Sequence, residues 1–191
     1  MPTDDDGEIA RYAQEFAAIH EAFGRLVEGV DEEAFNRRPS PDRWSIGECL
    51  AHLVITADQY LPALDGAIER AWAARLTGTG PFQHGPIGNW FVRFMEPPVK
   101  TRVKAPGKFQ PPRQRHSMDA TVAAFRDRQN QFLARLRRAS GLHLSRVKVR
   151  SPAMPLMRWS LGQTFALMAA HERRHLWQAG KVKEEIRGFP S

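Results

Sequence analysis

The sequence contains a single cysteine, and this scarcity narrows the chemistry open to the chain. Cys49 has no second thiol with which to form an internal disulfide, and thiolate clusters that bind metals are excluded. One unpaired cysteine fits a reducing compartment. Long apolar runs are also lacking, and the acidic N-terminus around Asp4–Asp6 lacks the basic and then apolar pattern of a secretion signal. We therefore expect a cytoplasmic protein with no membrane span.

Acidic residues are outnumbered by basic ones, which raises the question of a nucleic-acid partner. The chain has 21 Asp and Glu against 28 Lys and Arg, a formal net charge of +7. No zinc-finger, helix-turn-helix or single-strand-binding signature accompanies this charge. The arginines between Arg126 and Arg150 alternate with apolar residues, as on a solvated helix face. We expect no nucleic-acid partner, and the charge suits an anionic small-molecule substrate or thiol instead.

The spacing of apolar residues predicts a helical protein. The length of 191 residues and a hydrophobic content of 42% suit a single domain spanning 1–191, with flexible tails at 1–7 and 182–191. Apolar residues at three- and four-residue steps predict four helices, over Glu8–Val30, Ser45–Leu76, Met118–Ala139 and Ser160–Lys181. A proline-rich segment with several aromatic residues, Thr77–Ser117, separates the second helix from the third, and residues 142–157 form an extended connection.

Two histidines four residues apart lie in the last predicted helix. His171 and His175 fall on one helix face, so both imidazoles can point at one metal ion. With Glu172 between them they spell the H-E-x-x-H pattern of zinc proteases. The chain after His175 argues against a protease, because Gly180 and Lys181 stand where the metzincin pattern needs a glycine and a third histidine. A third ligand is therefore expected upstream.

A repeated hexapeptide shows where the third ligand can be sought. Residues 43–48 (RWSIGE) and 158–163 (RWSLGQ) differ little, and each has the serine and the Glu or Gln of a capping box. Helices should therefore begin within a residue or two of Ser45 and Ser160. His52 lies in the second turn after the first of these starts. The repeat makes His52 the leading candidate without showing that the three imidazoles meet.

These segments resemble the DinB-like (DinB/YfiT) family of metalloenzymes. The matching pieces are residues 44–53 (WSIGECLAHL), 159–163 (WSLGQ) and 171–178 (HERRHLWQ). The resemblance implies an all-α, up-and-down four-helix bundle with a long Pro-rich insert between helices 2 and 3. It also implies one divalent metal ion held by His52, His171 and His175. Family members include thiol-dependent S-transferases and isomerases that use low-molecular-weight thiols, so the resemblance suggests fold and metal more firmly than a reaction.

Other residues near the histidines have simpler interpretations. Glu48 could act as a base or orient His52, but a capping-box role explains it adequately. Cys49 is interpreted as a buried thiol, and Glu172, about 100° around the helix from His171, as a surface residue in a salt bridge. The remaining histidines have no ligand spacing: His20, His84, His116 and His143. His84 or His116 could reach the site if the proline-rich segment covers it.

Three imidazoles would leave a metal ion with an open coordination position, as in catalytic sites. Zinc and nickel both suit such ligands, and the ion could activate either a water or a thiol. We therefore expect a metal-dependent hydrolase or thiol-dependent S-transferase acting on a small molecule. The alternative is a non-catalytic metal- or ligand-binding stress protein. A homodimer formed through the aromatic residues of the proline-rich segment is a further expectation.

Overall fold

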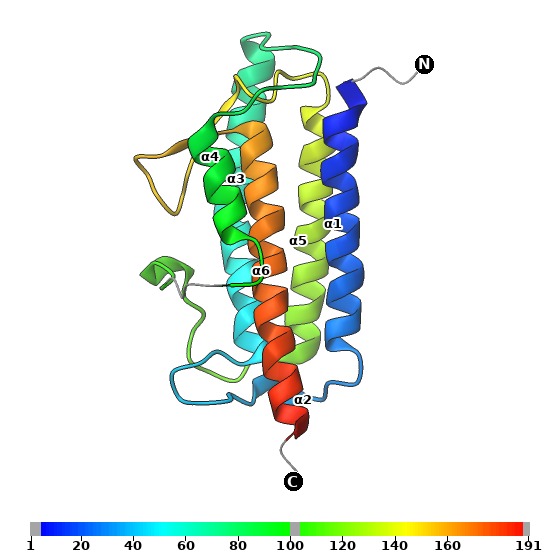
Figure 1. Cartoon of the computed structure of the whole chain (residues 1–191), viewed down its shortest axis with the longest axis vertical. Helices are drawn as coiled ribbons and strands as arrows, with labels where there is room; N and C mark the ends of the chain where they lie inside the picture. Colours follow the sequence, from blue (N-terminus) through cyan, green and yellow to red (C-terminus); the bar gives the residue numbers. More distant parts are fainter. Residues whose placement is uncertain (1–4, 100–103, 189–191) are drawn as a thin grey trace.

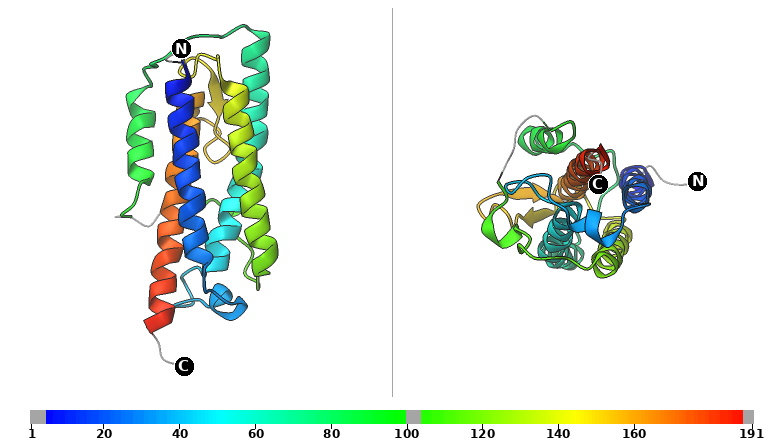
Figure 2. Two further views of the ribbon diagram at one scale, coloured as in Figure 1. Left: turned by 90° about the vertical axis from the view of Figure 1, so that its right-hand side faces the viewer. Right: turned by 90° about the horizontal axis from the view of Figure 1, so that it is seen from below.

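Four long helices dominate the computed structural model, which describes residues 5–99 and 104–188 (Figure 1). They are α1 (Asp5–Val27), α3 (Ile46–Ala73), α5 (Met118–Ala139) and α6 (Leu161–Gly188). Helix α1 packs against α5 and α6, and α3 packs against the same two helices, so all four surround one core (Figure 2). The predicted all-α class is confirmed, with the addition of one short pair of strands.

The order of helix directions differs from the expected up-and-down arrangement. Ion pairs between α3 and α5 keep a constant sequence offset, since Asp58 pairs with Arg128 and Asp65 with Arg135, which shows that these neighbours are parallel. Helix α5 starts at the same end of the molecule as α3, and the described parts of the connection, 74–99 and 104–117, lie along the bundle between these ends (Figure 1). Short connections force neighbouring helices to be antiparallel, and a long one removes that constraint.

The connections contain more structure than the sequence predicted. A short helix, α2 (Glu32–Asn36), precedes α3, and the proline-rich segment contains α4 (Pro86–Met95) and a 3-10 turn, η1 (Gly107–Phe109). Helix α4 packs on α6. Strands β1 (Lys148–Arg150) and β2 (Arg158–Ser160) pair antiparallel, with Val149 opposite Trp159. Strand β1 lies within the predicted extended connection, and β2 directly follows it.

Both predicted capping boxes are present. Ser45 Oγ accepts from Glu48 N at 3.1 Å and Glu48 Oε2 accepts from Ser45 N at 3.0 Å, so α3 starts where expected. Ser160 ends β2, and the same reciprocal pair with Gln163 begins α6 at the next residue. The repeat therefore has a direct structural cause, because each copy satisfies the free N–H groups at the start of a long helix.

The ends of the helices depart from prediction by about one turn at α1 and α3, which end at Val27 and Ala73 rather than Val30 and Leu76, and by more at α6. Helix α6 continues to Gly188, seven residues beyond the predicted end at Lys181, and Val182 is buried. Of the tails expected to be flexible, residues 1–4 and 189–191 lie outside the described residues, whereas 5–7 and 182–188 are helical. None of the helices in the described part is long and apolar enough to cross a membrane.

Candidate metal centre

The three candidate histidines come together between α3 and α6, although His52 and His171 are 119 residues apart in sequence. One ligand atom from each ring lies within 4.8 Å of the others. The ring centroids of His52 and His175 are 4.4 Å apart, and those of His171 and His175 are 4.6 Å apart. Helix α6 supplies two rings from consecutive turns of one face, and the antiparallel α3 brings the third to the same level.

The hydrogen bonds of His52 fix which nitrogen faces its neighbours. His52 Nδ1 lies 2.6 Å from the carbonyl oxygen of Phe109, which can only accept, so the proton must be on Nδ1. His52 Nε2 is then an unprotonated nitrogen, and it lies 3.2 Å from His171 Nε2. This arrangement, in which a backbone carbonyl sets the tautomer of a histidine, is typical of metal-binding imidazoles.

The group passes a geometric and chemical test for a divalent ion. Two nitrogens bound tetrahedrally to one zinc ion would lie about 3.3 Å apart, close to the observed separation of 3.2 Å. His175 Nδ1 is buried and has no hydrogen-bond partner among the described residues. A buried unpaired nitrogen is costly, and coordination would satisfy it. The residues present therefore fit the metal that the sequence suggested.

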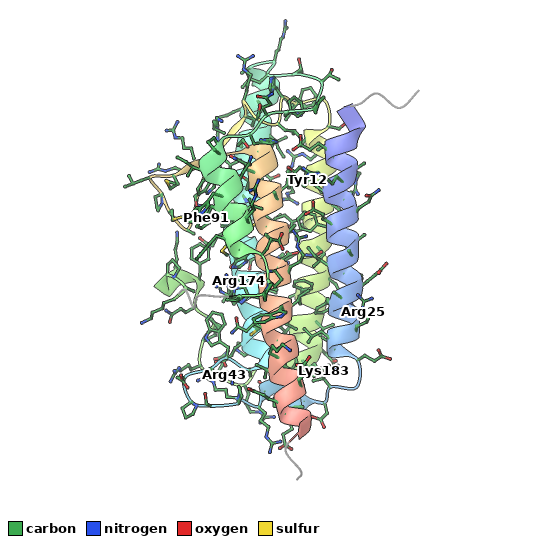
Figure 3. The ribbon with its side chains drawn as sticks, in the orientation of Figure 1. Tyr12, Arg25, Arg43, Phe91, Arg174 and Lys183 are labelled. Atoms are coloured by element: carbon green, nitrogen blue, oxygen red, sulfur yellow. The ribbon has the colours of Figure 1, made fainter. Side chains whose placement is uncertain are left out.

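Burial keeps these imidazoles neutral. Burial lowers the pKa of His52, although the hydrogen bond to Phe109 opposes this effect. Burial also lowers the pKa of His171 well below the ordinary value, and electrostatic interactions with His52 and Arg174 act in the same direction. His175 is affected in the same way, by burial first and then by its two histidine neighbours. Arg174 projects from the adjacent position of α6 (Figure 3). Neutral imidazole is the form that binds a metal, so the site is prepared for one at neutral pH.

The surroundings of the group contain no fourth ligand within the described residues. Trp44 stacks obliquely over two of the rings, 5.0 Å from His52 and 5.8 Å from His175 between centroids. Glu48 is engaged elsewhere, because its carboxylate pairs with Arg38 and completes the capping box. Cys49 is fully buried and does not join the group, which agrees with its predicted role as a core thiol.

The prediction for Glu172 was wrong. Its side chain is 4% exposed and faces the interior, where it accepts a hydrogen bond of 2.6 Å from Gln129 Nε2 of α5. Burial raises the pKa of its carboxyl to about 8, an effect only partly offset by the hydrogen bond and by Arg173. Helix α6 is covered on several sides, so a position about 100° from the histidines is still inside the molecule. Glu172 does not join the histidine group, which removes the general base that a protease would need.

The other histidines take structural positions. His84 bridges Ser160 Oγ and Glu8 Oε1 at 2.8 and 2.7 Å, and His116 binds back to the preceding turn at Pro112. Neither reaches the three-histidine group. The proline-rich segment does approach the group, but through the Phe109 carbonyl. Sequence reasoning missed this contact because every residue carries the same backbone acceptor.

The fold and this group describe a helical protein with a candidate centre for a divalent metal ion. The sequence profile of the DinB superfamily matches residues 15–179, so the chain belongs to the DinB superfamily. No curated protein sequence matches the chain significantly. No solved structure does so either.

Proposed function

We propose that this protein is a metal-dependent enzyme acting on a small molecule, either a hydrolase or a thiol-dependent S-transferase. The observation that supports this best is the group of three neutral histidines, two of them buried and His171 partly so, with no fourth protein ligand among the described residues. Sites of three protein ligands leave a position for water or substrate, as catalytic metal sites do. His52, His171 and His175 would hold zinc or nickel.

The chain's own residues would position the reaction. Phe109 holds the ring of His52 in one tautomer, and Trp44 covers two rings and limits access of bulk water. A bound divalent ion would lower the pKa of a water or thiol that occupies its open coordination position. Hydrolysis and thiol transfer both use that property, so the residues present support the two reactions equally.

The burial of the group favours one alternative, a non-catalytic metal- or ligand-binding stress protein. His52 and His175 are 3% and 8% exposed and His171 is partly exposed, so a substrate could approach the centre only from the side of His171. The DinB superfamily match and the helix packing also support a four-helix-bundle domain with the proline-rich segment as its insert.

We further propose a cytoplasmic homodimer in which the two copies contact each other through α4, where Ile87 and Trp90 are exposed.

Metal analysis and turnover on the same samples test the proposal. Protein purified without added metal should contain about one zinc or nickel ion per chain, and the loaded protein should turn over esters or transfer a small thiol to an electrophile. His171→Ala should abolish both properties, while His20→Ala, which removes a solvent-exposed histidine of α1, should change neither. A cobalt-substituted sample should change its visible spectrum when thiols are added. Metal binding without turnover or spectral change would favour the non-catalytic stress protein. Cleavage of peptides would instead favour the protease interpretation of the H-E-x-x-H pattern.

A further inference from the structure

A cavity lies beside the first turn of α3. It has a volume of about 280 Å³, and Arg38, Arg113 and Arg115 line it together with Asn36 and Glu48. Three guanidinium groups face one carboxylate, so positive charge is in excess. The start of α3 adds the positive end of a helix dipole. The electrostatic character of this cavity therefore suits an anion.

Two of its guanidinium groups share a single acceptor. Arg38 Nη1 and Arg113 Nη2 both donate to the carbonyl oxygen of Pro41, at 2.9 and 3.4 Å. Glu48 neutralises Arg38. In the described part of the chain, no carboxylate pairs with Arg113 or Arg115. Like charges held this close repel, and an oxyanion between them would offset the repulsion through charge-assisted hydrogen bonds.

The segment that carries Arg113 and Arg115 is fixed at both ends. Asn36, at the end of α2, accepts from His116 N at 2.7 Å and donates to His116 O at 3.0 Å. At the other end Phe109 is buried, and its carbonyl oxygen binds His52. A site held in place before its ligand arrives loses less conformational entropy on binding.

The same contacts connect the cavity with the histidine group. Glu48 lines the cavity and lies one helical turn before His52, a rise of about 6 Å along α3. Only three residues, 110–112, separate Phe109, the backbone partner of His52, from Arg113 in the cavity. The cavity therefore lies near the histidine group without including it, which is the placement required for a small molecule with an anionic end among the arginines and a reactive end at the histidines.

We propose that this cavity is an oxyanion subsite, which binds the carboxylate or phosphate end of the small molecule on which the histidine centre acts. Arginine suits this task because its planar fork donates two parallel hydrogen bonds to either group. The assignment of the anion to a substrate rests on the proposed function. Binding of the anion itself does not, so the two can be tested apart.

Titration of metal-free protein with inorganic phosphate and with acetate, at constant ionic strength, tests the subsite by calorimetry. The wild type should bind at least one of these probes, and the stronger one identifies the chemical class. The double variant Arg113→Ala/Arg115→Ala should bind it at least tenfold more weakly. The control Arg137→Ala/Arg146→Ala removes the same charge from exposed positions outside the cavity and should bind as the wild type does.

Three outcomes would overturn the subsite. Equal weakening in both double variants would assign the binding to overall surface charge. No binding of either probe by the wild type would show that the cavity does not hold an oxyanion. Loss of binding in His171→Ala would place the anion at the histidines instead. Retained binding in His171→Ala supports the subsite even if the proposed enzymatic function fails.

Discussion

The glycine of the second repeat copy offers a sharp test of how α6 is joined to the rest of the molecule. A Cβ added at Gly162 would lie 2.5 Å from Cε1 and 2.8 Å from Nε2 of His84, and 3.0 Å from Glu8 Oε1. His84 would have to leave its position between Ser160 and Glu8. The substitution Gly162→Ala should therefore break both hydrogen bonds of this ring.

The magnitude follows from those two bonds. A neutral hydrogen bond contributes about 1 kcal/mol and one to a charged group about 2 kcal/mol, so their loss costs roughly 3 kcal/mol. Alanine is a better helix former than glycine by about 1 kcal/mol, which opposes the loss. The net expectation for Gly162→Ala is a destabilisation of roughly 2 kcal/mol.

Gly180 supplies a matched control in the same helix. A Cβ at Gly180 would meet nothing within 4 Å, so Gly180→Ala should stabilise the protein by up to about 1 kcal/mol. In a His84→Ala background both hydrogen bonds are already absent, so Gly162→Ala should keep only the gain in helix propensity and stabilise the protein by up to about 1 kcal/mol. The double-mutant cycle should therefore show a coupling of roughly 3 kcal/mol between positions 84 and 162.

Urea unfolding of metal-free protein measures all four variants, with the slope checked for constancy. Metal-free samples are chosen so that the histidine centre does not contribute. If Gly162→Ala is as harmless as Gly180→Ala, a Cβ at position 162 does not displace His84. An unchanged cost of Gly162→Ala in the absence of His84 would equally show that the ring is not the obstacle.

Three further predictions concern the centre and its neighbour. Replacing His52, His171 or His175 by alanine should weaken zinc or nickel binding by about 100-fold or more in competition titrations, and unchanged affinity in any of the three would remove that residue from the ligand set. Because burial lowers the pKa of His171 and His175, protons should compete with the metal only below the ordinary histidine range; a midpoint above pH 6.5 in a pH series of metal affinity would contradict this. Glu172 has its folded pKa raised from 4.5 to about 8, so its cost to the folded state is absent below pH 4.5, grows as pH rises and levels off above pH 8. In urea unfolding of metal-free protein, Glu172→Gln should gain stability over the wild type across this window, by a few kcal/mol at pH 8, whereas Glu172→Ala should lose part of that gain through the cavity and the unpaired Gln129 amide. A constant difference between Glu172→Gln and the wild type from pH 5 to pH 8 would refute the raised pKa.

Much of the candidate site could be predicted because its determinants are local in sequence. The i, i+4 spacing of His171 and His175 is a property of one helix, and the two capping boxes are contacts over three residues. The interpretation of Glu172 failed because exposure is not local. A position on a helix is a surface position only where no other element covers it, and α5 supplies Gln129 at that point.

The sequence by itself determined the helical class and the starts of α3 and α6, since periodicity and capping chemistry act within a few residues. It also placed His171 and His175 on one helix face, while His52 joined them as a candidate through the repeat and the family resemblance. Only the tertiary structure decided that α3 and α5 run parallel, that Phe109 fixes the tautomer of His52, and that Arg38 and Arg113 converge on Pro41. These features join residues far apart in the chain, through backbone atoms and long side chains that carry no distinctive pattern. Their positions depend on how the whole chain packs around one core.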